Sequence, residues 1–137
     1  MSWAPYVETL EKGKGRCKYA GIFGISPVSP WAESANKESF PITVDDVSNL
    51  IRVIKSQDMN VMASGVRIGG NLSFTCLRLE PNILVMQGKG DNKDYSVVVA
   101  LSNQACIIGF NPDADIKAAQ VRDSLEQLRD HLCAACY

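Results

Sequence analysis

The sequence predicts an α+β protein with one antiparallel sheet, a helix at each end of the chain and a third helix in between. Three observations predict it: apolar residues with helical spacing in three regions, short apolar segments after Gly65, and turn-forming breaks between those segments. Breaks this short join only antiparallel neighbours, because a parallel pair needs a crossover of about a dozen residues or more.

The length and composition predict a single domain over residues 1–137. A chain of 137 residues is near the commonest domain size and too short for two ordinary domains. Hydrophobic residues make up 46% and charged residues 21%, as in an average globular protein. The formal net charge of −1 excludes an overall basic field for nucleic acid, so no nucleic-acid partner is expected.

Two features predict the cellular compartment: the lack of a membrane span or secretory signal, and the pattern of the cysteines. No apolar run approaches the roughly 20 residues of a membrane span, and the N-terminus lacks the layout of a secretory signal. The five cysteines are an odd set without the spacing of a disulfide framework, which indicates reduced thiols. We therefore expect a cytoplasmic protein without a membrane span.

The first helix is expected to begin at Ser2, whose side chain can accept a hydrogen bond from a first-turn N–H. Its apolar residues follow helical spacing: Trp3, Tyr6, Val7 and Leu10. Gly13 ends this helix, and residues 12–18 form a basic, flexible connection to the sheet.

Two strands are expected next. Residues 19–25 are apolar and contain glycine, as in a buried strand. The segment 26–30 contains two prolines and breaks this strand, so a short second strand is expected over residues 31–34.

The middle helix is expected over residues 44–55. Thr43 supplies a hydroxyl cap, and Asp45 and Asp46 place carboxylates in the first turn, where the helix dipole favours them. The apolar residues of its buried face have helical spacing: Val47, Leu50, Ile51 and Ile54.

Five further strands and a last helix complete the predicted fold. The strands are expected over residues 66–68, 72–79, 83–87, 95–101 and 105–110. Residues 112–115 form a loop before the last helix. The docked face of that helix carries Val121, Leu125, Leu128, Leu132 and Cys136.

Aromatic residues are concentrated near the two ends of the chain. Trp3 and Tyr6 lie at the start, His131 and Tyr137 lie at the end, and Trp31 follows a proline-containing break. Flat rings with indole or hydroxyl donors are what a polyproline II ligand needs, because proline rings stack between them and exposed carbonyls accept hydrogen bonds. The alternative is that Trp3 and Tyr6 are core anchors, that Tyr137 is a frayed end and that His131 is a lone surface histidine.

Four motifs, two of them at the ends of the chain, resemble those of the profilin family. They are Ser2-Trp3 followed by Tyr6-Val7 and Leu10, Trp31-Ala32, Gly65-Val66-Arg67-Ile68-Gly69-Gly70, and His131-Leu132 with Tyr137. The resemblance spans essentially the whole chain. It implies a central antiparallel sheet with the N- and C-terminal helices packed together on one face and the helix over about residues 44–55 on the other.

The resemblance also implies a function in the cytoplasm and cytoskeleton. A profilin binds monomeric actin and proline-rich segments of actin-assembly factors and so regulates actin polymerisation. The implied proline-binding residues are Trp3, Tyr6, Trp31, His131, Leu132 and Tyr137. The implied actin-binding residues are Ala63, Thr75, Arg78, Lys89, Ser96 and Arg122. Phosphoinositide head groups would meet the basic residues Lys12, Lys14, Arg16 and Lys18, for which a solvated loop is the alternative.

Two departures from the family pattern concern the actin-binding surface. Residues 111–115 replace the usual glycine-rich turn before the last helix, and Asp123 stands where a lysine is common. Because like charges across an interface are costly, a second hypothesis is a divergent proline-rich-ligand adaptor with weak or no actin binding.

A third hypothesis is a small thiol enzyme that uses His131 with Cys133 or Cys136. The two cysteines have CxxC spacing, but a second ligand pair is missing, and the motif lies at the end of a helix. The chain has a single histidine and no paired carboxylates that indicate acid and base roles. We therefore expect no enzymatic activity, no cofactor and no metal site.

Overall fold

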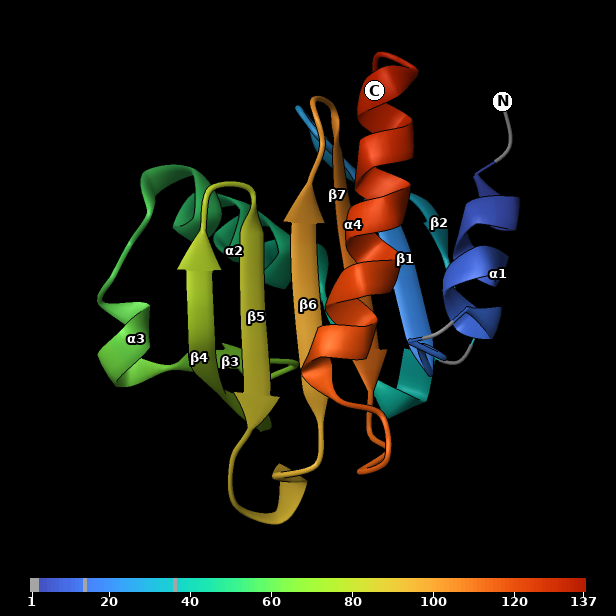
Figure 1. Ribbon diagram of the computed structural model, residues 1–137. Helices are drawn as coiled ribbons and strands as arrows, with labels where there is room; N and C mark the ends of the chain where they lie inside the picture. Colours follow the sequence, from blue (N-terminus) through green and yellow to red (C-terminus); the bar gives the residue numbers. More distant parts are fainter. Residues whose placement is uncertain (1–2, 14, 36) are drawn as a thin grey trace.

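The computed structural model describes residues 3–13, 15–35 and 37–137, and the centre of this part is an antiparallel sheet (Figure 1). Its seven strands lie in the order β2-β1-β7-β6-β5-β4-β3. The strands are β1 (Tyr19–Ile25), β2 (Val28–Glu33), β3 (Val66–Ile68), β4 (Leu72–Glu80), β5 (Ile83–Gly88), β6 (Ser96–Leu101) and β7 (Ala105–Asn111). The predicted α+β class and the antiparallel pairing are confirmed.

The helices cover both faces of the sheet. Helices α1 (Ala4–Lys12) and α4 (Ala118–Ala134) lie side by side on one face, where α1 contacts β1 and β2 and α4 contacts β5, β6 and β7 (Figure 1). Helix α2 (Val44–Ser56) lies on the other face, against β1 and β2. Among the described residues, no helix is long and apolar enough to cross a membrane.

Alternation along the strands divides the core into two layers. On β6, Val97 and Val99 pack toward α2, whereas Val98 and Ala100 pack toward the terminal helices. This follows from the strand geometry, in which successive side chains point to opposite faces. The predicted stripe of α4 is buried in the second layer through Val121, Leu125, Leu128 and Leu132.

Helix α2 begins after the predicted cap Thr43, and the structure adds a capping box with Asp46. The Asp46 N–H donates to Thr43 Oγ1 over 3.1 Å, and the Thr43 N–H donates to Asp46 Oδ2 over 3.0 Å. The same Asp46 oxygen accepts the Gly69 N–H over 3.0 Å. One carboxylate therefore satisfies the start of α2 and holds the turn between β3 and β4.

Three sequence-based expectations about local structure are wrong. The N-cap of α1 is Trp3, without a side-chain cap, and the expected cap Ser2 lies outside the described residues. Strand β2 begins at Val28 and not at Trp31, because a proline is tolerated in an edge strand. Helix α4 ends at Ala134, so Cys136 is exposed and does not belong to the docked stripe.

Residues 15–17, in the connection between α1 and β1, form hydrogen bonds with other parts of the chain. The Gly15 N–H donates to Ser124 Oγ over 3.0 Å, and the Cys17 N–H donates to the Leu10 carbonyl over 3.1 Å. The buried Asn111 amide donates to the carbonyls of Gly15 and Arg16 over 2.8 and 2.6 Å. Side chains from β7 and α4 therefore hold Gly15 and Arg16 in place.

Short helices complete the fold and were not predicted. Helix α3 (Val61–Ser64) contacts β4, and two 3₁₀ turns, η1 (Lys37–Ser39) and η2 (Gly90–Asn92), lie in the connections before α2 and before β6. A helix of four residues is too short to show helical periodicity in the sequence, which explains the omission.

Candidate functional site

Five of the six residues expected at the proline-binding site converge into one group of rings. We call this group the aromatic cluster: Trp3, Tyr6, Trp31, His131 and Tyr137. Trp3 lies at its centre, with its ring centroid 4.7 Å from that of Trp31 in a stacked arrangement. The Tyr137 ring meets Trp3 edge-on at 5.0 Å, and the Tyr6 ring lies at 5.6 Å.

The rings come from four separate parts of the chain and remain partly accessible. Tyr6 on α1 reaches His131 on α4, with 5.7 Å between ring centroids and 3.5 Å between Tyr6 Oη and His131 Nε2. His131 is exposed, and Trp3, Tyr6, Trp31 and Tyr137 are half-buried. The rings pack on the core with one side and face solvent with the other.

The sixth expected residue, Leu132, lies beneath the cluster. Its side chain is 0% exposed and belongs to the core layer on which four of the rings pack. Leu132 therefore supports the aromatic cluster without reaching the surface that a ligand would contact.

Trp31 is aimed into the cluster by an irregularity of the sheet. Ile22 pairs with Ala32 and Phe23 pairs with Pro30, so Trp31 is the extra residue of a bulge in β2. A bulge re-aims the side chain that it carries. The indole then lies against Gly24, where a Cβ atom would stand 2.8 Å from Trp31 Nε1. Only glycine leaves room for it there.

Tyr137 is held by the turn between β6 and β7. Its backbone carbonyl accepts Ser102 Oγ over 2.8 Å and also accepts the Gln104 N–H. The Gln104 side-chain amide donates to the Cys136 carbonyl over 3.1 Å. The sequence marks residues 102–104 only as a turn, and it carries no signal that this turn positions a ring.

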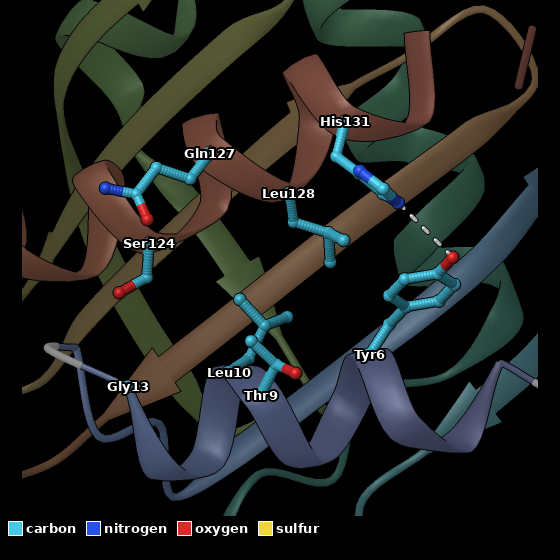
Figure 2. Close-up of a pocket in the computed structure, with 8 residues that line it drawn as sticks. All are labelled: Tyr6, Thr9, Leu10, Gly13, Ser124, Gln127, Leu128 and His131. Atoms are coloured by element: carbon cyan, nitrogen blue, oxygen red, sulfur yellow. Dashed lines mark hydrogen bonds between the residues drawn. The ribbon is translucent and has the colours of Figure 1, made fainter. Parts of the chain in front are cut away.

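A cleft of about 480 Å³ lies between α1 and α4, next to the Tyr6–His131 pair (Figure 2). Its floor is apolar, because Leu10 and Leu128 are 1% and 6% exposed. Its polar lining comes from Thr9 on α1 and from Ser124 and Gln127 on α4. The aromatic cluster therefore continues at this end into a hollow with an apolar base.

The residues expected to bind actin lie away from the aromatic cluster, toward the β3 edge of the sheet. Ala63 is on α3, Thr75 and Arg78 are on β4, Lys89 follows β5, and Arg122 is in the first part of α4. The structure does not bring the sixth residue to this surface. Ser96 on β6 is 1% exposed, and its hydroxyl donates to the Asn111 carbonyl over 3.4 Å.

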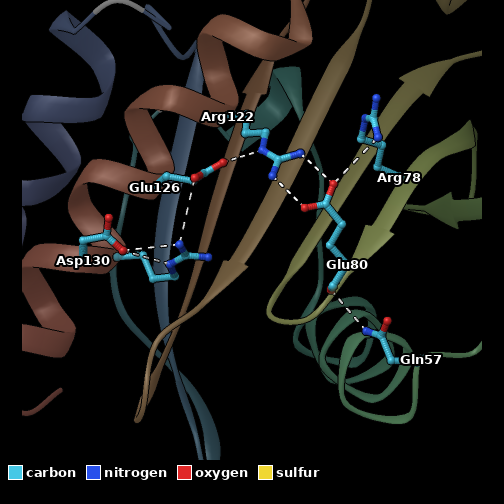
Figure 3. A network of polar contacts seen from close by, with 7 residues as sticks. Gln57, Arg78, Glu80, Arg122, Glu126 and Asp130 are labelled. Atoms are coloured by element: carbon cyan, nitrogen blue, oxygen red, sulfur yellow. Dashed lines mark hydrogen bonds and ion pairs between the residues drawn. The ribbon is translucent and has the colours of Figure 1, made fainter.

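Two of these cations belong to a polar network around Glu80 (Figure 3). We call it the Glu80 network: Gln57, Arg78, Glu80, Arg122, Glu126, Arg129 and Asp130. Arg122 forms a bidentate pair with Glu80 at 2.8 and 3.0 Å and also pairs with Glu126. Arg78 lies 4.0 Å from the Glu80 carboxylate. The charges of Arg78 and Arg122 are thus largely neutralised by carboxylates of the same chain.

The pairing also changes the ionisation of the partners. The Arg122 hydrogen bonds lower the pKa of Glu80 below its ordinary value, although desolvation opposes this shift. The same hydrogen bonds raise the pKa of Arg122. Both shifts favour the charged forms, so the pair persists at lower pH than an isolated carboxylate would allow.

The basic residues considered for phosphoinositides lie around the start of β1. Lys12, Arg16 and Lys18 are exposed, and Lys14 lies outside the described residues. Arg16 follows Gly15, whose backbone N–H is bonded to Ser124, and Lys18 directly precedes β1.

The cysteines fall into two groups. Cys17, Cys76 and Cys106 are buried, and Cys133 and Cys136 are exposed near Tyr137. Burial raises the pKa of Cys17 to about 12 and raises the pKa of Cys106 as well. Across residues 3–13, 15–35 and 37–137, no three potential ligands gather as they would around a metal ion.

The fold and the site define a class of small α+β proteins that pack both terminal helices on one face of an antiparallel sheet and present aromatic rings beside them. The profilin family model matches the chain over residues 1–137. The chain therefore belongs to the profilin family.

Individual relatives agree with this membership. Profilin-1 of Entamoeba histolytica is 29% identical over 142 residues, with 100% of both chains covered. Acanthamoeba castellanii profilin IA has a similar structure, with a TM-score of 0.79 at 24% identity over 99% of this chain and 100% of its own. Mouse profilin IIa, solved in complex with a double repeat from the FH1 domain of mDia1, gives a TM-score of 0.78 at 15% identity over 100% of both chains.

Proposed function

We propose that this profilin binds proline-rich segments at the aromatic cluster and monomeric actin at a second surface, and that it regulates actin polymerisation by linking the two. The observation that carries the proposal is the convergence of Trp3, Tyr6, Trp31, His131 and Tyr137 from distant parts of the chain. The mouse profilin solved with an FH1 repeat supports the same kind of ligand for this chain.

The cluster suits a polyproline II helix for physical reasons. This helix has no internal hydrogen bonds, so its carbonyls are free to accept from indole and phenol donors. Its proline rings pack against flat aromatic faces, and its extended form is preorganised, so little entropy is lost on binding. One such contact is weak, and repeated proline runs raise the effective concentration for rebinding.

The actin surface is proposed from family membership and from position. It comprises Ala63, Thr75, Arg78, Lys89 and Arg122, and it leaves out the buried Ser96. In the strand order, β4 is separated from β2 by four strands. Both ligands could therefore bind at once, which is what recruitment of a bound actin monomer requires.

A second candidate is an adaptor that binds proline-rich segments but binds actin weakly or not at all. The observation that favours it is the internal pairing of Arg122 with Glu80 and Glu126. A cation engaged in this way has less to offer an acidic partner, and the exposed Asp123 beside it adds a negative charge.

Several narrower expectations accompany the proposal. We infer no enzymatic activity and a location in the cytoplasm and cytoskeleton. Phosphoinositide head groups are a further candidate ligand for Lys12, Arg16 and Lys18. Each basic residue near an anionic surface contributes about 1 kcal/mol, so that attraction would be modest and sensitive to salt.

One pair of titrations tests the proposal. Tryptophan fluorescence should change on addition of polyproline, because Trp3 and Trp31 lie in the cluster. A gel shift with monomeric actin should show a complex that still binds polyproline. Proline binding without an actin complex selects the adaptor, and failure of polyproline to bind contradicts the proposed role of the cluster.

A further inference from the structure

A second hollow opens at the opposite end of the aromatic cluster, beside Trp31. It has a volume of about 260 Å³ and lies between the β1–β2 turn, the end of α2 and the β6–β7 turn. It is lined by Gly24, Ile25, Ser26, Pro27, Ser29, Trp31, Lys55, Asn103 and Gln104. Trp31 is shared with the cluster, so a ligand that extends past this ring would enter the hollow.

The chemistry of this hollow differs from that of the cleft between α1 and α4. Its lining carries one cation, Lys55, together with the polar side chains of Ser26, Ser29 and Asn103, and it contains no carboxylate. Lys55 is exposed, and it forms no ion pair within the described part of the chain. The cleft at the other end is lined by Leu10 and Leu128 and contains neither lysine nor arginine.

We propose that the hollow binds the carboxylate of an acidic residue that flanks the proline run of a ligand held in the aromatic cluster. The inference rests on the proposed function. A polyproline II helix rises about 3.1 Å per residue, so a flanking residue lies one short step beyond the last stacked proline. Lys55 supplies the opposite charge, and the neighbouring hydroxyl and amide groups can donate to the remaining oxygen lone pairs.

The proposal also gives the ligand a direction. Among the described residues that line the two hollows, Lys55 at the Trp31 end is the one lysine or arginine, because the cleft at the Tyr6 and His131 end has an apolar floor and neither residue type. An aspartate should therefore increase affinity at one flank of a proline run and not at the other. The acidic flank then fixes which end of the segment lies over Trp31.

The first experiment compares peptides by tryptophan fluorescence: a plain proline run, the run with aspartates at its N-terminal flank, with aspartates at its C-terminal flank, and with lysines at either flank. One aspartate-flanked peptide should bind about two- to fivefold more tightly than the plain run, which is the range for an exposed ion pair. The gain should disappear near 1 M salt, where screening extends over only about 3 Å.

The second experiment reverses the charge of Lys55. Lys55→Glu should keep the affinity for the plain run, lose the gain from aspartate and prefer lysine at the same flank. Lys55→Gln should lose both preferences. Lys93→Glu is the matched control, because Lys93 is also an exposed lysine, in the connection before β6, and the net charge changes equally. Thermal melting checks that all three variants fold.

The outcomes separate this inference from the proposed function. If the plain run binds but neither aspartate flank improves affinity, or if Lys93→Glu removes the gain as fully as Lys55→Glu does, the inference is wrong and the proposed function stands. Equal gains at both flanks would also overturn it. If the plain run fails to bind the unmodified protein, the proposed function and the inference fall together.

Discussion

The aromatic cluster and the Glu80 network are both surface assemblies, yet they leave different groups available to a partner. The rings of the cluster pack on one another, and each remains at least partly exposed. In the Glu80 network, the guanidinium of Arg122 is directed at Glu80 and Glu126 of the same chain. If partners bind at both surfaces, a ligand of the cluster meets rings already in place, whereas a partner of the Glu80 network must exchange internal ion pairs for external ones.

Because of this difference, different interactions should contribute to the binding of the two proposed partners. A ligand at the cluster gains apolar contact with rings that are already in place, and preorganisation of this kind lowers the cost of binding. Arg122 already pairs with Glu80 and Glu126. Its contribution to the binding free energy of a partner is therefore only the difference between the new ion pair and these internal pairs. Charge complementarity there acts more on rate and specificity than on affinity.

The largest expected effect comes from removing the ring at the centre of the cluster. Trp3→Ala removes the contacts to Tyr6, Trp31 and Tyr137 at once. An interface anchor of this kind is worth about 2 kcal/mol or more, so affinity for polyproline should fall at least about 30-fold by calorimetry. Actin binding should be unchanged.

Thermal melting distinguishes a surface platform from a core anchor at this position. If Trp3→Ala mainly lowers Tm and proline affinity falls only slightly, the ring is a core anchor. The aromatic cluster would then not be a binding surface, and its contrast with the Glu80 network would no longer hold. Met59→Ala is a suitable control, because Met59 is 58% exposed and lies outside both surfaces.

A smaller effect is expected from the turn that holds Tyr137. Ser102→Ala removes the hydroxyl that donates to the Tyr137 carbonyl over 2.8 Å. A hydrogen bond of this kind contributes about 0.5–1.5 kcal/mol, so proline affinity should fall about two- to tenfold. Ser56→Ala, which removes an exposed hydroxyl bonded within α2, is the matched control and should leave proline binding unchanged. An equal loss of proline affinity in both variants would show that Ser102 has no specific role in positioning Tyr137.

Substitution of Glu80, at the centre of the Glu80 network, should have a smaller effect, a rise in actin affinity. Glu80→Gln keeps the shape of the side chain but removes the charge that balances Arg122 and Arg78. If actin binds at this surface, its affinity should rise about two- to fivefold at low salt, the range of an exposed pair. Asp130→Asn, at the far end of the network, is the control for net charge. An unchanged or lower affinity in Glu80→Gln would show that the internal pairs do not compete with actin.

Much of the fold could be predicted from the sequence because its signals are local. The Thr43 cap lies within one helical turn, and the short apolar run of β6 lies within one strand. The start of β2 could not be predicted, since Pro30 disfavours a central strand and only the assembled sheet makes β2 an edge.

The aromatic cluster was predicted through the resemblance of the chain ends, but its supports were not. Gly24 and Ser102 act through contacts with residues distant in sequence, and neither carries a motif. Arg122 and Glu80 are separated by 42 positions, so their pairing is also invisible in the sequence. Residue types can be read locally, whereas partners depend on the folded arrangement.

The smallest expected effect is the contribution of Glu80 to the pH dependence of stability. Because Arg122 lowers the pKa of Glu80 in the folded state, the pair stabilises the protein fully above the ordinary glutamate value of about 4.3. That contribution is lost as the pH falls through the lowered folded pKa. The Tm of the unmodified protein should therefore exceed that of the Glu80→Gln variant slightly at pH 6, and the difference should vanish in strong acid.

Two measurements decide whether this pH dependence comes from ionisation of Glu80. A Tm difference that stays constant down to about pH 2, below the ordinary range of carboxylate pKa values, would mean that the substitution changes packing and not ionisation. Proline affinity of the unmodified protein should show no matching step over the same pH range, because the ring contacts of the aromatic cluster involve no carboxylate. A parallel loss of proline affinity would instead couple the two surfaces, and the contrast between them would then no longer hold.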